Sequence, residues 1–250
     1  MIPKIIHYCW LSSDPVPPQL RACIDSWHRV LPDYEIRLWD YKRFPRGKSK
    51  WVDEAFDSRK YAFAADYIRA YALFHEGGIY LDSDVEVLRS FNDLLSVPHL
   101  MCRECGSGLV EAAVMGAEAG HPLMGALLRH YDSHDFRRPD GTLETTGMPA
   151  VVGMMVDQLG LKLNYVDDTA HFSDSPDSLN VLPYDYFSPI NIENMEMRRT
   201  ARTYCIHHFA GSWTSPWRRF KKRMQVALGP TASQWVINAK RRAKRLLGVS

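Results

Sequence analysis

Apolar positions in the first part of the chain follow two spacings, that of strands and that of helices. Residues 4–10 form an apolar run that predicts a buried strand, and residues 34–39 alternate apolar and polar side chains as a second strand does. Between them, residues 18–30 repeat apolar side chains at helical spacing, up to the break at Pro32. This order of strand, helix and strand predicts an α/β protein with a parallel sheet.

The next segment has the most regular helical pattern of the chain. Residues 59–75 place apolar side chains at a 4-3-4 spacing, which predicts a helix with one face against the sheet. Gly77 and Gly78 end this helix, and residues 79–81 predict a short buried strand. Further along, we expect strands over residues 109–115 and 161–166, helices over residues 121–131 and 148–159, and irregular structure over residues 167–200.

Two carboxylates, Asp82 and Asp84, follow the strand predicted over residues 79–81. In α/β sheets the carboxyl ends of strands are where ligands bind. The two side chains point the same way only if the backbone bends between them, as it does where a strand leaves its sheet. So placed, they form an oxygen-rich site for Mg²⁺ or Mn²⁺ that a diphosphate can complete. For a lone Asp-x-Asp pattern, a solvated turn is the alternative interpretation.

Two further pairs carry candidate chemistry. Asp66 and Arg69 are three apart in the predicted helix, so they form either an ion pair of about 0.2–0.5 kcal/mol or a polar pair aimed at a sugar or phosphate. His207 and His208 end a short apolar run, where they are either hydrogen-bonded side chains or metal ligands. Because imidazole is softer than the ligands Mg²⁺ prefers, a histidine ligand favours Mn²⁺.

Charge divides the chain into two parts. The net charge is +2, yet residues 218–250 carry ten of the 31 Lys and Arg and no acidic residue. The segment also has an apolar helical face, which predicts a basic amphipathic helix on an anionic membrane surface. A solvated helix and nucleic-acid contact are alternatives; no aromatic-interleaved basic patch elsewhere supports a nucleic-acid partner, and we expect none.

Other features bound the class of protein. The 250 residues are normal for one α/β enzyme. Five irregularly spaced cysteines argue against a disulfide framework and for a reducing compartment. The first residues do not read as a secretory signal, and no apolar run of about 18 residues predicts a membrane span. We therefore expect a cytoplasmic protein, peripheral at the inner face of the cell membrane through its basic tail.

Four stretches, taken in order and spacing, resemble the glycosyltransferase family with a DXD sugar-binding motif. They are residues 2–10, 61–69, 77–85 and 207–213. That family includes bacterial capsular and lipopolysaccharide sugar transferases and the yeast initiating α-1,6-mannosyltransferase; more distantly, the chain resembles the catalytic domain of clostridial glucosylating toxins. The resemblance covers residues 1–217 and implies a GT-A-type nucleotide-sugar-binding fold, a mixed, mainly parallel sheet flanked by helices. Residues 218–250 lie outside it.

The resemblance implies a role for residues that would bind the donor. Trp10 would stack on the nucleotide base, with His7 and Tyr8 of the same strand also contacting substrate. Asp66 and Arg69 would hydrogen-bond the donor sugar, and Arg69 would also lie near the diphosphate. For Asp66 and Arg69, the resemblance therefore favours donor binding over a simple ion pair.

The resemblance also implies a divalent metal, usually Mn²⁺. Asp82 would contact the metal and the ribose, Asp84 would bind the metal directly, and His208 is favoured over His207 as a further ligand. Residues that would contact the phosphates are Tyr80, Ser212 and Trp213. With Asp66 and Arg69, the two aspartates make up the predicted catalytic group.

The implied activity is the retaining transfer of a hexose or N-acetylhexosamine from a nucleotide-sugar, UDP-linked before GDP-mannose, to a glycan or lipid-linked oligosaccharide in cell-surface polysaccharide synthesis. Glu111, Asp140 and Glu144 are candidates for acceptor contacts because they lie near predicted loops. Two alternatives stay open. One is a haloacid-dehalogenase-like phosphatase, with Asp167 and Asp168 as its late acidic pair; the other is a non-catalytic sugar- or membrane-binding module.

Overall fold

A computed structural model describes residues 1–211 of the chain, arranged around a five-stranded sheet of order β2-β1-β3-β6-β5. Its strands are β1 (Ile5–Cys9), β2 (Glu35–Trp39), β3 (Gly78–Leu81), β5 (His99–Leu100) and β6 (Val114–Ala117). β1 pairs in parallel with β2 and β3, whereas β6 pairs antiparallel with β3 and β5. Four strands therefore share one direction, which confirms the predicted α/β class and its mixed, mainly parallel sheet.

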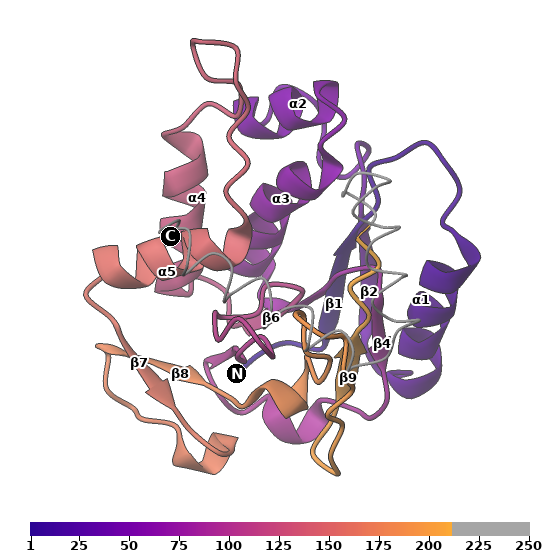
Figure 1. Cartoon of the computed structure of the whole chain (residues 1–250), viewed down its shortest axis with the longest axis vertical. Helices are drawn as coiled ribbons and strands as arrows, with labels where there is room; N and C mark the ends of the chain where they lie inside the picture. Colours follow the sequence, from indigo (N-terminus) through magenta and orange to yellow (C-terminus); the bar gives the residue numbers. More distant parts are fainter. Residues whose placement is uncertain (212–250) are drawn as a thin grey trace, which may run out of the picture.

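Helices cover both faces of this sheet (Figure 1). They are α1 (Pro18–Val30), α2 (Lys50–Asp57), α3 (Tyr61–Glu76), α4 (Pro122–Asp132) and α5 (Met148–Gln158). In Figure 1, α1 stands on one side of the strands and α2 to α5 gather on the other. The predicted arrangement of a sheet between helices is confirmed.

Each face of the sheet has its own apolar core, because successive side chains of a strand point to opposite faces. On the α1 side, Ile24 and Trp27 pack with Ile79 and Leu81 of β3. On the other side, Tyr80 of the same strand packs with the side chains of α2 to α5. Asp82 continues this alternation, so that it leaves the sheet on the face that carries α3.

Two small sheets complete the described part. β4 (Val85–Val87) pairs antiparallel with β9 (Cys205–His207), and β7 (Lys162–Tyr165) pairs in parallel with β8 (Ser178–Val181). Single-turn 3₁₀ helices occur at Asn92–Leu94, Thr169–His171 and Tyr184–Tyr186. The β4–β9 pair joins the segment after β3 to the last described strand.

Most predicted elements are confirmed, and the differences have local causes. The strand expected over residues 109–115 begins only at Val114, because Glu111 turns the backbone by accepting the N–H groups of the next two residues. Helix α2 was not predicted; the hydroxyl of Ser49 caps it by accepting the N–H of Val52. β8 lies within the segment that was expected to be irregular.

Across residues 1–211, no helix combines the length and the apolar character that a membrane span requires. The predicted basic tail, with Ser212 and Trp213, lies outside the described residues.

The approach of β3 to β1 leads to a first prediction. Gly78 has a φ of +111°, and a Cβ there would lie 2.7 Å from the carbonyl oxygen of Ile5, whereas a Cβ on Gly141, at a φ of +81°, would meet nothing within 4 Å. Both Gly→Ala changes carry about 1–2 kcal/mol of backbone strain. The clash should add about 1–3 kcal/mol in G78A alone. Urea unfolding of both variants tests this, and equal destabilisation would contradict the close packing.

Candidate active site

The two predicted aspartates lie in a tight turn at the end of β3. The N–H of Asp82 donates to the carbonyl of Ala113 at 2.8 Å, and the N–H of Val85 donates to the carbonyl of Asp82 at 2.9 Å. This turn bends the backbone between Asp82 and Asp84, so that both carboxylates face the same side, as predicted from the sequence. From there the chain enters β4, so that Asp84 stands directly beside β9.

β9 brings a histidine to these carboxylates. His207 lies opposite Val85 in the β4–β9 register, and its Nε2 is 3.6 Å from Oδ1 of Asp84. Asp82, Asp84 and His207 each offer one possible metal-binding atom, and these three atoms lie within 4.8 Å of one another. Two carboxylates and one imidazole form a donor set that suits a divalent cation such as Mn²⁺. The residues present therefore fit a metal of this kind.

The prediction that favoured His208 over His207 needs correction. His208 points away from Asp82 and Asp84, and its Nε2 lies 3.0 Å from Oε2 of Glu86 in a largely exposed pair. Its backbone N–H donates to the carbonyl of Asp84 at 3.0 Å. The register of β9 therefore turns His207, not His208, toward the carboxylates.

The imidazole of His207 stands between two buried acids. Its Nδ1 lies 3.3 Å from Oε2 of Glu111, on the opposite side from Asp84. Burial by itself would lower the pKa of His207, but Asp84 and Glu111 raise it well above its usual value. Burial would raise the pKa of each acid, yet the contact with His207 lowers both to about 2. The three side chains thus form a buried ionic cluster.

Asp84 has further support from the turn after β9. Its Oδ2 accepts the N–H of Ala210 at 2.7 Å. Glu111, by contrast, is only 2% exposed and faces His207, so the prediction that it contacts an acceptor is wrong. Asp140 and Glu144 lie in the exposed loop before α5, and their role stays a prediction.

Arg69 forms the second half of the site. Its guanidinium is buried, with one terminal nitrogen 2.8 Å from Oδ1 of Asp82 and 3.6 Å from Oδ1 of Asp66. The guanidinium carbon lies 4.3 Å from the centre of the Tyr80 ring, and the other terminal nitrogen contacts the sulfur of Met148 at 3.2 Å. The structure therefore unites Asp66, Arg69, Tyr80 and Asp82. The contribution of Met148 had no signal in the sequence pattern.

Burial sets the charge state of these groups. It raises the pKa of Asp66 to about 7, although Arg69 works in the other direction. Burial also raises the pKa of Asp82, with Arg69 opposing it and Asp84 adding to it. For Arg69, burial would lower the pKa, but Asp82 and Asp66 more than reverse this effect. The guanidinium is a fixed positive charge, whereas Asp66 is poised between its neutral and charged forms near pH 7.

The residues predicted on β1 separate into two groups. Trp10 follows β1 at the edge of the sheet where β3 also ends, is half-buried, and donates from its indole N–H to the carbonyl of Asp14 at 2.9 Å. Tyr8 points to the opposite face from α3 and packs edge-to-face on Trp27 at 5.3 Å. Of the two, Trp10 is therefore the one at the edge where Asp82 lies.

His7 is a structural residue. It is fully buried, its Nε2 lies 2.7 Å from the carbonyl of Gly77, and its Nδ1 accepts the indole N–H of Trp39 at 3.0 Å. Both ring nitrogens have protein partners, so the structure contradicts the prediction that His7 contacts substrate. Burial lowers the pKa of His7 to about 4 despite the carbonyl of Gly77.

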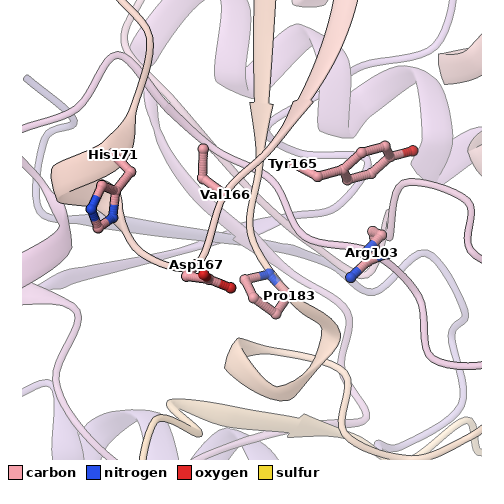
Figure 2. A pocket seen from close by; sticks show the side chains of 6 residues that line it. All are labelled: Arg103, Tyr165, Val166, Asp167, His171 and Pro183. Carbon is pink, nitrogen blue, oxygen red and sulfur yellow. The ribbon is translucent and has the colours of Figure 1, made fainter.

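A separate pocket of about 290 Å³ lies beside β7 and β8 (Figure 2). Its lining residues are Arg103, Tyr165, Val166, Asp167, His171 and Pro183. The guanidinium carbon of Arg103 lies 5.0 Å from the centre of the Tyr165 ring. None of the residues predicted for the transferase site lines this pocket. Asp168 caps the turn Thr169–His171, so the acidic pair that the phosphatase alternative requires belongs to this region.

Comparisons with known proteins find similarity to glycosyltransferases over part of the chain. Residues 17–100 match the family described as glycosyltransferase sugar-binding region containing DXD motif. This segment is therefore similar to the sugar-binding region of the DXD-motif glycosyltransferases, and it contains Asp66, Arg69, Tyr80, Asp82 and Asp84.

Individual relatives match about half of the chain. It is 35% identical over 137 residues to inositol phosphoceramide mannosyltransferase 3 of Schizosaccharomyces pombe, covering 52% of this chain and 37% of that protein. It is 33% identical over 143 residues to mannosyl phosphorylinositol ceramide synthase SUR1 of Saccharomyces cerevisiae, covering 54% and 37%. The matches thus span less than two fifths of the length of these curated relatives. Among solved structures, PaToxG glycosyltransferase is similar at a TM-score of 0.47 and 19% identity, over 63% of this chain and 69% of that chain.

The buried imidazole of His7 leads to a second prediction. A histidine whose pKa is about 4 in the folded state and about 6.5 in the unfolded chain binds fewer protons when folded, so stability falls as the pH drops from about 6.5 towards 4. H7Q removes this contribution. Although less stable overall, it should lose less unfolding free energy than wild type between pH 7 and pH 5 in urea titrations.

The exposed His28 of α1 provides the control. H28Q should keep the wild-type pH dependence in the same urea titrations. An unchanged pH dependence in H7Q would contradict the structural role assigned to His7.

Proposed function

We propose that the protein is a metal-dependent glycosyltransferase that moves a hexose from a nucleotide-sugar to a lipid-linked or glycan acceptor. One observation carries this proposal: Asp82, Asp84 and His207 converge within 4.8 Å, next to a buried guanidinium. The match of residues 17–100 to a sugar-binding family supports it further. Asp167 and Asp168, which the phosphatase alternative needs, follow β7 outside this cluster.

The chemistry requires that negative charge growing on a departing nucleoside diphosphate be stabilised. Asp82, Asp84 and His207 would hold a divalent cation, Mn²⁺ before Mg²⁺, which supplies positive charge to the diphosphate when bound. Arg69 adds a second positive charge that is already oriented by Asp82 and Asp66. Charges held in place before the reaction stabilise a transition state without reorganisation at the moment of transfer.

The sugar itself would meet Asp66 and Arg69. With a pKa of about 7, the carboxyl of Asp66 can accept a hydrogen bond when ionised and donate one when protonated. Trp10, at the same edge of the sheet, is available to stack on the base. A retaining outcome by front-face attack belongs to the proposal; in it the departing phosphate takes the acceptor proton, and no protein base is required.

The names of the relatives bear on donor and acceptor. One yeast relative is named inositol phosphoceramide mannosyltransferase 3 and another mannosyl phosphorylinositol ceramide synthase, so both names refer to mannose and a ceramide lipid. This supports a mannose donor, GDP-mannose, ahead of the UDP-sugars preferred from sequence, and a lipid-linked acceptor. A peripheral position at the inner face of a membrane fits such an acceptor. A role in capsule or lipopolysaccharide synthesis remains part of the proposal.

Donor binding gives the third prediction. GDP, UDP and their sugar conjugates should raise the melting temperature in the presence of Mn²⁺, because a ligand at 100 times its Kd stabilises the folded state by about 2.7 kcal/mol. D84N should lose the Mn²⁺-dependent part of this shift. D25N, on the exposed face of α1, should keep it. Equal shifts with and without Mn²⁺, in wild type and D84N alike, would contradict the metal-dependent donor site.

The fixed charge of Arg69 gives the fourth prediction. R69K retains a positive charge but loses the planar contacts to Asp82 and Asp66, so kcat should fall by about 10²–10³. R29K, an exposed change in the last turn of α1, should leave kcat near wild type.

The assay measures the nucleoside diphosphate and free sugar released from GDP-mannose and UDP-sugars with Mn²⁺. Release of inorganic phosphate from a sugar phosphate, without an acceptor, would instead identify a phosphatase.

A further inference from the structure

We propose that Glu111 is a positioning residue: it orients the imidazole of His207 so that Nε2 faces the cation position beside Asp82 and Asp84. This inference rests on the proposed metal dependence. Glu111 lies outside the matched residues 17–100, and its sequence position near predicted loops had made it a candidate for acceptor contacts instead.

Carboxylates lie on two sides of the His207 ring. Its Nδ1 lies 3.3 Å from Oε2 of Glu111, and its Nε2 lies 3.6 Å from Oδ1 of Asp84. A third contact comes from the ring of Phe209, whose centroid lies 3.9 Å away. A side chain on β9 alone could rotate about its second torsion angle. The contact with Glu111 selects one orientation.

Glu111 itself is held rigidly. Its Oε1 accepts the N–H groups of Ala112 at 2.9 Å and Ala113 at 2.8 Å, which leaves Oε2 for His207. Its own N–H donates to the carbonyl of Cys102 at 2.8 Å. The backbone N–H groups of the next two residues therefore hold the carboxylate in place independently of its contact with the imidazole.

The same short segment also fixes Asp82. The carbonyl of Ala113 accepts the N–H of Asp82 at 2.8 Å. Residues 111–113 thus set the position of one carboxylate through the main chain and of the histidine through a side chain. Displacing this segment would change both relative to Asp84.

The chemistry of imidazole ligands explains why this arrangement matters. A histidine binds a metal through the lone pair of one ring nitrogen while the other nitrogen carries a proton. Metal-binding histidines almost always donate that second N–H to a carboxylate, a carbonyl or water, which fixes the tautomer and ring orientation. Once a cation displaces the proton of Nε2, donation from Nδ1 to Glu111 would leave the lone pair on Nε2, the nitrogen that faces Asp84. His208 lacks such a buried partner, because its contact with Glu86 is exposed.

The test measures the affinity of the full chain for Mn²⁺ in the absence of nucleotide, by following the electron paramagnetic resonance signal of free Mn²⁺. E111A should weaken Mn²⁺ binding by about 10–100-fold, the usual effect of removing such a partner. E111Q, which keeps one acceptor oxygen, should cause a smaller loss and carries the test if E111A does not fold. E104Q removes the charge of a neighbouring buried glutamate that does not contact either ring nitrogen, so it should cost less Mn²⁺ affinity than E111Q.

A double-mutant cycle separates positioning from a general effect of charge. In an H207A background, E111A should cause no further loss of Mn²⁺ affinity, because its effect passes through the imidazole. An undiminished loss in that background would overturn the inference, as would wild-type affinity in folded E111A or E111Q. Absence of Mn²⁺ binding by wild type would overturn both the proposed metal dependence and this inference, so the two failures are distinguishable.

Discussion

The antiparallel pairing of β4 with β9 is the constraint on which the candidate site depends. It places His207 opposite Val85, one residue beyond Asp84, and lets the turn after β9 donate the N–H of Ala210 to Asp84. The main sheet supplies Asp82 and α3 supplies Arg69, but neither brings an imidazole. The short strands after the main sheet therefore convert a pair of aspartates into a set of three converging ligand groups.

The site also concentrates charge where water is scarce. Arg69 is buried between Asp66 and Asp82, and its Nε has no hydrogen-bond partner among the described residues. Buried ion pairs contribute little net stability, because removing charges from water costs several kcal/mol per ion before pairing offsets it. Fold stability therefore does not explain this arrangement, whereas in the proposed transferase Arg69 would hold a positive charge beside the phosphates of the donor.

Local patterns predicted much of this structure, and register determined the rest. Spacing predicted the strand, the turn with two aspartates and the helix that carries Asp66 and Arg69, and the family resemblance placed these four side chains in one site. The choice between His207 and His208 depends on how β9 is aligned with β4, since a shift by one residue turns every side chain to the opposite face. No pattern within residues 204–208 contains that information, and family resemblance favoured the wrong neighbour.

The same reasoning explains His7 and Glu111. A strand buried on both faces shows no alternation of polar and apolar side chains. The sequence therefore does not distinguish a histidine that contacts a substrate from one that is hydrogen-bonded within the protein, as His7 is to Gly77 and Trp39. Glu111 fell inside the strand expected over residues 109–115, whereas β6 begins only at Val114, and it was a candidate for acceptor contacts because it lies near predicted loops. Its partner lies 96 residues further along the chain, beyond the reach of any local signal.

The long sequence separation between Asp84 and its partners from the β9 segment affects how the site forms during folding. Asp84 and His207 are 123 positions apart in the sequence, so the three ligand groups are neighbours only after a loop of that length has closed. In the unfolded chain they are dispersed, and the entropy of closure must be recovered from the folded contacts. A cation that binds the assembled site would add its binding free energy to the folded state alone. Metal occupancy and the docking of β9 would then be thermodynamically coupled, each strengthening the other.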